Sequence, residues 1–251
     1  MFNIFKKKII KSDTPAKIPQ HIAFICDGNR RWAEKRGLPP LMGHRAGIRN
    51  FENFGDWFIA HGVSTITFYI FSTENWNRTK EEVDFLMDLF YTELKKNMKH
   101  AIEKNLRYRV VGSRDKLPKK LAKLCDELEE VSAENTGGTI VFALNYGGQD
   151  EIIRAVNAAI ENGEPVDKDS FETFMDTGDL LPVDLMVRTS NENRISNFLL
   201  WKLAYAELLF IPEHWPDLVK SERLWQHILD EYQKRDRRFG GGKKKNYSGK
   251  K

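Results

Sequence analysis

The sequence predicts a single α/β domain built on a mostly parallel, six-stranded sheet flanked by helices. Short apolar runs recur along the chain with helix-patterned segments between them, and such strict alternation is typical of parallel sheets. No internal repeat or linker divides the 251 residues, and that length suffices for one sizeable core. We therefore expect one domain over residues 18–240, with basic tails at 1–17 and 241–251.

Six runs are predicted strands because they are apolar, rich in β-branched and aromatic residues, and bounded by turn residues. They are residues 22–26, 64–71, 107–112, 138–146, 184–189 and 208–211. Apolar residues at helical spacing predict a long helix over residues 81–104. A short helix is predicted to begin at Ala33. The other predicted helices cover residues 43–60, 117–134, 150–161, 169–175, 197–205 and 221–235.

Composition excludes several classes of protein. A hydrophobic content of 41% with 12% aromatic residues fits a globular chain, and no apolar run reaches the roughly 20 residues that span a bilayer. The N-terminus has no secretory signal pattern, so we expect a cytoplasmic protein. Cys26 and Cys125 lie far apart and are interpreted as free thiols of a reducing compartment.

The net charge of +4 is unevenly distributed. Residues 1–17 carry five lysines and one aspartate, residues 234–251 carry nine lysines and arginines and one aspartate, and the body between them has a net charge of −8. An acidic body argues against a broad nucleic-acid-binding face. The basic tails fit either solvated ends or a peripheral contact with an anionic membrane.

The segment Asp27-Gly28-Asn29-Arg30-Arg31-Trp32 directly follows the first predicted strand and precedes a predicted helix. Ligands of open α/β sheets bind at this edge, where helix N-termini attract anions. Asp-Gly-Asn is also ordinary turn chemistry, with the aspartate as a helix cap. A turn does not require the two arginines, however, and cations in a first helical turn oppose the helix dipole. The segment suggests a site for a metal-bridged phosphate ester.

Three further polar segments are expected near this one. Residues 71–78 follow the second predicted strand, residues 188–197 follow the fifth, and Glu207 stands just before the last. Because carboxyl ends of parallel strands share one edge of a sheet, these segments should converge. Convergence would gather Arg30, Arg31, Arg78, Arg188 and Arg194 around Asp27 and Glu207.

That set of side chains indicates a phosphate site with a metal. Arginine recognises phosphate in a bidentate manner, and two carboxylates suit one Mg²⁺. Each residue alone has a simpler explanation, such as a core aromatic, a helix cap or a surface ion pair. Five arginines at one edge without an anionic ligand would nevertheless repel one another. The sequence carries no nucleotide-binding signature of the Gly-x-x-x-x-Gly-Lys-Ser/Thr or Gly-x-Gly-x-x-Gly kind.

Five blocks, in order, resemble the cis-prenyltransferases, the undecaprenyl diphosphate synthase family, from about His21 to Gly240. They are Asp27-Gly28-Asn29-x-Arg31-Trp32-Ala33, Gly43-His44-x-x-Gly47, Phe71-Ser72-Thr73-Glu74-Asn75-Trp76-x-Arg78, Asn145-Tyr146-Gly147-Gly148, and Arg188-Thr189-Ser190-x-Glu192-x-Arg194-Ile195-Ser196-Asn197-Phe198, with Trp201, Glu207 and Trp215-Pro216. The resemblance implies a homodimer with a hydrophobic tunnel. It also implies an enzyme that adds isopentenyl diphosphate to an allylic diphosphate, such as farnesyl diphosphate or a longer one, and creates a cis double bond. The expected product is a cis-polyprenyl diphosphate, a lipid carrier for cell-envelope or glycan synthesis.

The family's residue roles carry over onto matching positions. Asp27 and Glu207 are implied to hold one Mg²⁺, and Asp27 and Asn75 to be catalytic, Asp27 in leaving-group departure and Asn75 in proton acceptance. An amide is a poor base, so a diphosphate oxygen is the alternative proton acceptor. The implied substrate-binding residues are Gly28, Asn29, Arg30, Arg31, Trp32, His44, Ser72, Thr73, Glu74, Trp76, Arg78, Arg188, Arg194, Ile195 and Ser196. Arg238-Phe239-Gly240 matches the family's C-terminal Arg-x-Gly, which is expected to reach the partner's active site.

Several positions depart from the family pattern. Arg30 stands where bacterial members usually have glycine, Pro40 replaces a common diphosphate-binding arginine, and Asn191 replaces a glycine. Ile70 stands where alanine is common, which suggests a narrower tunnel and a shorter product. These departures leave a short-chain or head-to-middle synthase of the same fold as an alternative. A non-catalytic partner subunit is a second alternative, disfavoured because the aspartate and the phosphate-binding arginines are all present.

Overall fold

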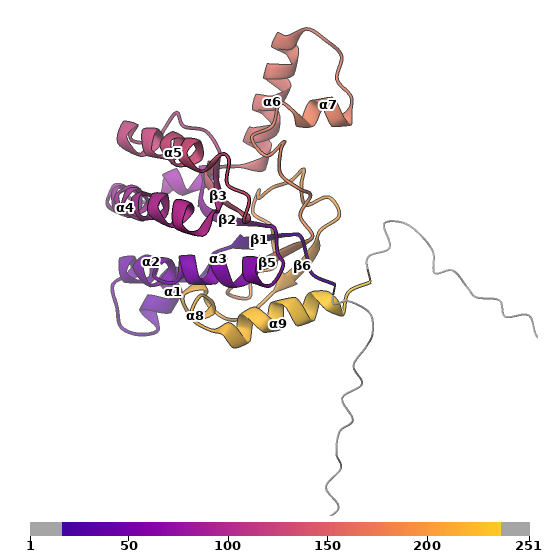
Figure 1. Cartoon of the computed structure of the whole chain (residues 1–251). Helices are drawn as coiled ribbons and strands as arrows, with labels where there is room; N and C mark the ends of the chain where they lie inside the picture. Colours follow the sequence, from indigo (N-terminus) through magenta and orange to yellow (C-terminus); the bar gives the residue numbers. More distant parts are fainter. Residues whose placement is uncertain (1–16, 237–251) are drawn as a thin grey trace, which may run out of the picture.

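Six parallel strands form one sheet in the order β3-β4-β2-β1-β5-β6, seen from its edge in Figure 1. This structure is a computed structural model that describes residues 17–236. The strands are β1 (His21–Ile25), β2 (Thr65–Ser72), β3 (Arg107–Val111), β4 (Thr139–Tyr146), β5 (Leu185–Arg188) and β6 (Glu207–Phe210). The predicted α/β domain with a six-stranded parallel sheet and flanking helices is thereby confirmed.

Helices connect the strands in the alternating order that the sequence indicates, except between β5 and β6, which are joined by turns. They are α1 (Asn29–Glu34), α2 (Pro40–Ile48), α3 (Phe51–Ala60), the 3-10 helix η1 (Thr73–Asn77), α4 (Lys80–Lys104), α5 (Lys119–Ser132), α6 (Gly148–Asn162), α7 (Lys168–Glu172), α8 (Trp215–Leu218) and α9 (Glu222–Gln233). The predicted helix over 43–60 is in fact two helices, because the chain leaves helical geometry at Asn50.

The predicted helix over residues 197–205 was wrong. This segment consists of turns. Asn197 and Leu199 in it, and Ser196 just before it, have φ values of 61°, 40° and 48°. Left-handed backbone of this kind cannot continue a right-handed helix. Its apolar residues Phe198 and Leu199 are buried all the same, packed against the sheet.

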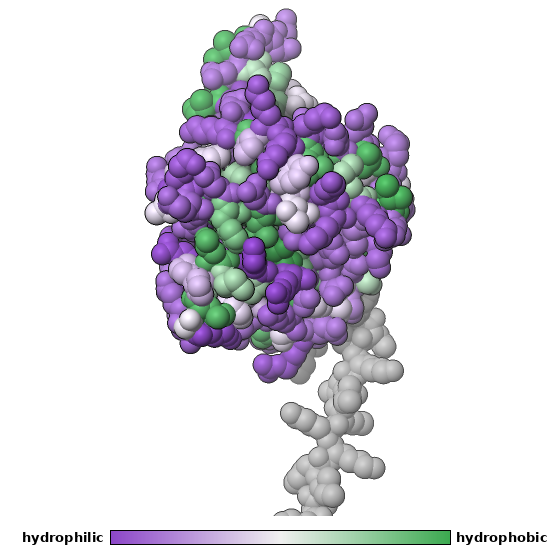
Figure 2. All heavy atoms as spheres, turned by 90° about the vertical axis from the view of Figure 1, so that its left-hand side faces the viewer, coloured by the Kyte–Doolittle hydropathy of each residue, from purple (hydrophilic) through white to green (hydrophobic). Residues whose placement is uncertain are grey.

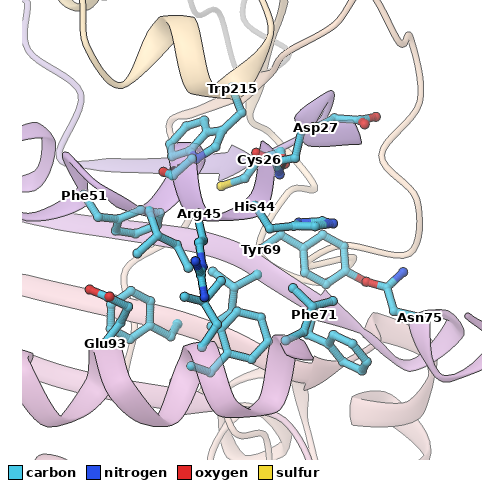
Figure 3. A pocket seen from close by; sticks show the side chains of 18 of the residues that line it. Cys26, Asp27, His44, Arg45, Phe51, Tyr69, Phe71, Asn75, Glu93 and Trp215 are labelled. Carbon is cyan, nitrogen blue, oxygen red and sulfur yellow. Dashed lines mark hydrogen bonds between the residues drawn. The ribbon is translucent and has the colours of Figure 1, made fainter. Parts of the chain in front are cut away.

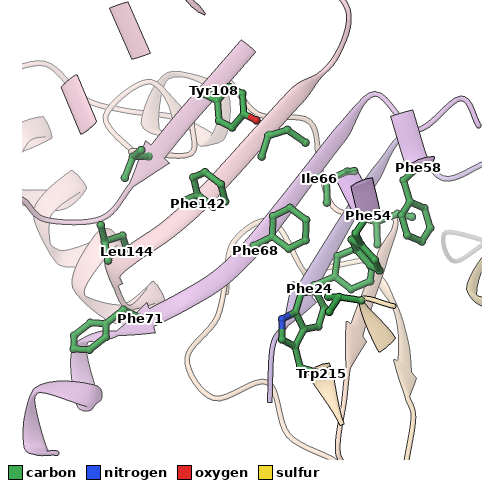
Figure 4. Packing of buried hydrophobic residues seen from close by; sticks show 14 of the residues in the cluster. Phe24, Phe54, Phe58, Ile66, Phe68, Phe71, Tyr108, Phe142, Leu144 and Trp215 are labelled. Carbon is green, nitrogen blue, oxygen red and sulfur yellow. The ribbon is translucent and has the colours of Figure 1, made fainter. Parts of the chain in front are cut away.

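Alternate residues of the strands bury themselves on opposite faces of the sheet, as the twofold side-chain period of a strand requires. Phe24, Phe68 and Phe142 face the layer of α3, α4, α5 and α9, where Phe54 and Trp215 join the aromatic cluster of Figure 4. The neighbouring strand residues, such as Ala23, Tyr69 and Met186, face the turn segment around Phe198 and Leu203. Both faces are therefore covered.

The register of the sheet places the carboxyl ends of β1, β2, β5 and β6 side by side. Ile25, the last residue of β1, lies opposite Tyr69 on one side and Arg188 on the other, and Arg188 lies opposite Phe210. Loops that follow these strands must therefore meet at one edge.

The basic tails, apart from Lys17, and Arg238-Phe239-Gly240 lie outside the described residues. Within residues 17–236, no helix combines the length and apolarity that a membrane-spanning segment needs.

Candidate active site

Asp27 lies just after the end of β1, and the backbone of the next residue has a conformation that only glycine adopts without strain. Gly28 has φ +94°, and a Cβ built on it would lie 1.8 Å from Ser190 Oγ. This close approach brings the loop after β1 against the loop after β5. It also starts α1 at Asn29, whose side-chain amide donates to the Cys26 carbonyl at 3.1 Å.

Two arginines contact the Asp27 carboxylate. Arg188 Nη2 lies 2.9 Å from Oδ2, Arg31 Nη2 lies 3.2 Å from Oδ1, and the Gly28 N–H donates to Oδ1 at 2.6 Å. Burial raises the pKa of Asp27, but Arg188 and Arg31 outweigh it and hold the pKa below its ordinary value. Asp27 is therefore an ionised carboxylate in a cationic setting.

Arg188 is a buried cation whose orientation is determined by the loop that follows it. The side chain is 4% exposed, and Nη1 donates to Ser196 Oγ at 2.7 Å and to the Arg194 carbonyl. Glu192 bridges Arg31 and Arg194, with Oε1 2.9 Å from Arg31 Nη1 and Oε2 against Arg194. Arg31, Arg188 and Arg194 thus converge, as the sequence predicts.

A second cluster surrounds Glu82 on α4. Its carboxylate accepts from Arg78 Nη1 at 3.0 Å, lies 3.3 Å from His44 Nε2, and lies 3.7 Å from Arg30 Nη1. Burial, and next the charge of Arg78, lower the pKa of His44 to about 4, so this imidazole is neutral near pH 7. Sequence analysis missed Glu82; its place four residues after Arg78 was the available signal.

The loop from Ser72 to Arg78 closes the site beside β2. Asn75 Oδ1 accepts from the Ser72 N–H at 3.1 Å, so the amide is engaged in holding the loop. Trp76 packs edge-on against Phe71 and donates to Asn145 Oδ1 at 2.7 Å, and Glu74 accepts from Asn197 Nδ2 at 3.1 Å. These contacts attach the loop to the ends of β4 and to the segment after β5.

A cavity of about 900 Å³ begins at these side chains and runs between α2 and α3 on one side and α4 on the other. Figure 3 shows Asp27, His44 and Asn75 at one end and Phe51 and Glu93 toward the other. The polar residues at the first end are Asp27, Asn29, His44, Ser72, Asn75, Arg78, Arg188, Arg194 and Ser196. The apolar walls come mainly from Ile48, Phe51, Ile70, Phe71, Phe85, Leu86, Leu89, Phe90 and Phe142.

Apolar surface also gathers in the middle of the face drawn in Figure 2, ringed by hydrophilic side chains. This is the side of the molecule where α2, α4 and α5 lie in Figure 1. At the surface, the Arg45 guanidinium stacks over the Phe85 ring at 5.4 Å, and both side chains line the cavity.

The remaining predicted site residues do not line the cavity: Gly28, Arg30, Arg31, Trp32, Thr73, Glu74, Trp76, Ile195 and Glu207. Most of them lie beside it, as Gly28, Arg30 and Arg31 do. Trp32 instead faces α8, where its Nε1 donates to Asp217 Oδ1 at 2.7 Å and Arg36 stacks on the ring at 4.2 Å. Trp32 and Trp76 thus act as packing residues that support the site.

The structure corrects the predicted position of Glu207 beside Asp27. It opens β6 opposite Leu185, the first residue of β5, and it pairs with Arg235 at 3.0 Å. The other ends of these strands, at Ile25 and Arg188, lie three residues or about 10 Å further along, and Asp27 follows two residues after Ile25. A residue just before a parallel strand lies at the opposite edge from one that follows a strand, so Glu207 cannot share a metal ion with Asp27.

Glu213, after β6, is the acidic residue at the correct edge, and sequence analysis missed it. Its carbonyl accepts from the Ser190 N–H at 2.8 Å, and the nearby Trp215 N–H donates to the Asp27 carbonyl at 3.0 Å. The signal was its position after the last strand and directly before His214-Trp215-Pro216.

The donor set suits Mg²⁺ that arrives together with a substrate. Within residues 17–236, no three acidic, cysteine or histidine side chains converge into a complete metal site. Asp27, however, supplies ionised hard oxygen atoms and is partly exposed. Mg²⁺ is usually held by one or two carboxylates together with substrate phosphates, so the residues present fit such an ion.

Comparison with known proteins agrees with this geometry. The family model described as putative undecaprenyl diphosphate synthase matches residues 25–240. An isoprenyl transferase of Thermotoga maritima is 42% identical over 230 residues, covering 90% of this chain and 98% of its own. A ditrans,polycis-undecaprenyl-diphosphate synthase of Micrococcus luteus, described as (2E,6E)-farnesyl-diphosphate specific, is 41% identical over 250 residues, or 96% of this chain and 100% of its own.

Two solved structures share the fold. Lavandulyl diphosphate synthase from Lavandula x intermedia, in complex with dimethylallyl diphosphate, superposes with a TM-score of 0.83 at 32% identity, over 88% of this chain and 98% of its own. A probable undecaprenyl diphosphate synthase from Campylobacter jejuni has a TM-score of 0.76 at 30% identity, over 89% of this chain and 99% of its own. The chain therefore belongs to the undecaprenyl diphosphate synthase family of isoprenyl transferases, the cis-prenyltransferases.

Proposed function

We propose that this isoprenyl transferase condenses isopentenyl diphosphate with an allylic diphosphate, farnesyl diphosphate or a longer one, to make a cis-polyprenyl diphosphate that serves as a lipid carrier. The observation that supports this most directly is the union of two environments in one cavity. Its polar end holds Asp27 among arginines, and its walls are apolar over a volume of about 900 Å³. A diphosphate and a hydrocarbon chain joined in one molecule would satisfy both.

The allylic diphosphate would bind beside the start of α1. Arg31 and Arg30 stand there with the backbone of Gly28 and Asn29, and the neutral His44, whose Nε2 N–H faces Glu82 Oε1, lies beside them. Ionisation of the allylic C–O bond develops negative charge on the departing diphosphate. Fixed cations near that charge lower the barrier because they need no reorganisation during the reaction.

Arg188, Arg194 and Ser196 would hold isopentenyl diphosphate. Arg188 is already fixed by Asp27 and Ser196, whereas Arg194 is 61% exposed and would have to exchange its ion pair with Glu192 for a ligand. After the new C–C bond forms, one proton must leave the condensed carbon skeleton. The Asn75 amide oxygen is occupied by the Ser72 N–H and is a poor base, so a diphosphate oxygen is the better acceptor and Asn75 shapes the loop.

Asp27 and Glu213 are the residues we propose for Mg²⁺. When bound, the ion would neutralise charge on the departing diphosphate. Arg31 and Arg188 hold the Asp27 carboxylate ionised, so a metal would find it deprotonated.

The apolar part of the cavity is the proposed tunnel for the growing chain. Ile48 and Phe51 on one side, and Phe85 and Leu89 on the other, provide walls without polar atoms. Ile70 contributes a branched side chain from β2 directly to this wall. A short-chain or head-to-middle synthase is the second candidate, favoured by the bulk of Ile70 in this wall and by the likeness to the Lavandula enzyme, which was solved with dimethylallyl diphosphate.

A homodimer is proposed from the surface of α6. Ile153, Val156 and Ile160 recur at helical spacing and are 60%, 38% and 70% exposed. An exposed apolar stripe on a projecting helix (Figure 1) suits a self-complementary contact about a twofold axis. The basic tails are proposed to add a peripheral membrane contact in the cytoplasm.

Incubation with labelled isopentenyl diphosphate, farnesyl diphosphate and Mg²⁺, followed by sizing of the products, tests the proposal. We expect incorporation into polyprenyl diphosphates and its loss in Asp27→Ala. Absence of incorporation with dimethylallyl, geranyl and farnesyl diphosphate alike would contradict it. Products limited to one condensation would favour the second candidate.

A further inference from the structure

Three consecutive residues after β6 join the loops that follow β1 and β5. The Glu213 carbonyl accepts from the Ser190 N–H at 2.8 Å, His214 Nδ1 lies 2.8 Å from Ser190 Oγ, and the Trp215 N–H donates to the Asp27 carbonyl at 3.0 Å. Ser190 Oγ itself donates to that same carbonyl at 3.0 Å. The main chains of Asp27 and Glu213 are thus joined through Ser190 and His214, and Thr189 Oγ1 also donates to the Asp27 carbonyl at 2.7 Å.

The hydrogen-bond directions in this chain are determined by burial. His214 is 8% exposed, Ser190 is 4% exposed, and His214 Nε2 is buried without a partner. A buried N–H without an acceptor costs more than a buried lone pair without a donor. His214 therefore carries its proton on Nδ1 and donates to Ser190 Oγ, and Ser190 donates to the Asp27 carbonyl.

The residues that form these hydrogen bonds are tightly packed against Gly28. The position of a Cβ on Gly28 would be 1.8 Å from Ser190 Oγ and 2.7 Å from His214 Nδ1. Ser190 and Asn191 hold φ values of +73° and +58°; asparagine tolerates this left-handed backbone, but serine adopts it rarely unless its surroundings impose it. Such strain is retained where the contacts on either side outweigh it.

We propose that His214 is a positioning residue that, through Ser190, fixes the separation of Asp27 and Glu213 and thereby the affinity for a divalent cation brought by the diphosphate. The inference rests on the proposed function, in which these two carboxylates hold the ion. Hydrogen-bond partners of metal ligands commonly change metal affinity or activity by about 10–100-fold when removed. The His214 side chain does not line the cavity, so it would act on the carboxylates through its bond to the Ser190 hydroxyl.

The test measures Mn²⁺ binding, by the fall of the free-ion electron paramagnetic resonance signal, in the presence of farnesyl thiodiphosphate, which resists ionisation. We expect His214→Leu and Ser190→Ala to weaken Mn²⁺ binding about 10-fold or more. His214→Asn, whose amide N–H can still donate to Ser190, should recover most of it. In turnover with Mg²⁺, His214→Leu should lower kcat and raise the half-saturating Mg²⁺ concentration, with little change in KM for isopentenyl diphosphate.

His21 provides a matched control. It is also a buried histidine, bonded to the Thr67 hydroxyl at 2.7 Å and to the Leu181 carbonyl at 2.7 Å, but it lies at the opposite end of β1. His21→Leu should lower stability and leave Mn²⁺ affinity unchanged. Equal losses in His21→Leu and His214→Leu, or no recovery in His214→Asn, would overturn the positioning role. A wild type that binds no Mn²⁺ with the analogue would instead overturn the proposed metal site, and with it this inference.

Discussion

Arg188 Nη2 lies 2.9 Å from Asp27 Oδ2, and this contact joins the carboxyl ends of β5 and β1. The arginine is buried, its Nη1 is engaged by Ser196 Oγ and the Arg194 carbonyl, and its Nε has no hydrogen-bond partner. One side chain therefore orients the proposed metal ligand and the proposed isopentenyl diphosphate loop together. The geometry explains why a cation is tolerated in the interior: its two terminal nitrogens meet a carboxylate, a hydroxyl and a carbonyl.

Removal of Arg188 should affect both stability and binding. Arg188→Ala leaves the Asp27 carboxylate without its nearest cation, and we expect the free energy of unfolding to fall by about 2–4 kcal/mol. Arg194→Ala is the matched control, because that exposed arginine should contribute less than about 1 kcal/mol. Both variants should raise KM for isopentenyl diphosphate. Urea unfolding and steady-state kinetics measure the two effects, and equal stability losses would refute the distinction.

Glu207 and Glu213 should differ sharply in activity. Glu207→Gln breaks only a half-exposed pair with Arg235 at the far edge of the sheet, so turnover should stay within about twofold of wild type. Glu213→Gln should reduce kcat by about 10–100-fold at fixed Mg²⁺, as loss of a metal ligand does. Parallel assays of the two variants decide the matter. A stronger effect of Glu207→Gln would restore the position that the sequence suggested.

Ile70→Ala should lengthen the product. The branched side chain contributes to the cavity wall, and its removal widens the space for the chain. Val110→Ala is a suitable control, because Val110 is equally a strand residue, buried away from the cavity. Thin-layer sizing of dephosphorylated products should show longer species in Ile70→Ala alone. Unchanged product length would remove Ile70 from the determinants of specificity.

Stability should fall as the pH drops below neutrality, in part because of His21. Burial, the largest cause, lowers the pKa of His21 to about 4, whereas an unfolded histidine titrates near 6.5. Between about pH 6.5 and 4 the unfolded chain binds a proton that the folded chain does not, so the free energy of unfolding decreases as pH falls through this window. Above about pH 6.5 both forms are neutral and the contribution is constant.

The His21→Gln variant isolates that contribution. Glutamine can keep the bonds to Thr67 and Leu181 but cannot take up a proton. Urea unfolding at pH 7, 5.5 and 4 should show a shallower loss of stability than in wild type. A slope identical to that of the wild type would mean that His21 does not protonate on unfolding in this range.

Much of this protein could be predicted from sequence because the patterns concerned are local. Strand runs, the helix-patterned segments 81–104 and 117–134, and the Asp27-Gly28-Asn29 turn each depend on neighbouring residues. The segment 197–205 failed for the complementary reason. Its apolar residues mimic helical spacing, but contacts with the sheet hold Ser196, Asn197 and Leu199 in left-handed backbone.

The amino-acid sequence by itself determined the sheet architecture, the family, and the edge at which Asp27 and Arg188 meet, since strand direction and residue order suffice for these. Only the tertiary structure decided at which edge of the sheet Glu207 and Glu213 lie. Glu207 and Glu213 lie six positions apart in the sequence, yet one precedes β6 and the other follows it. Residues before and after a strand lie at opposite edges of the sheet, a full strand length apart. An error of a few residues in a predicted strand boundary therefore places a side chain at the wrong edge. Packing of the loops against Gly28 and Ser190, which no local pattern encodes, then brings the main chain of Glu213 against Ser190, beside the loop of Asp27.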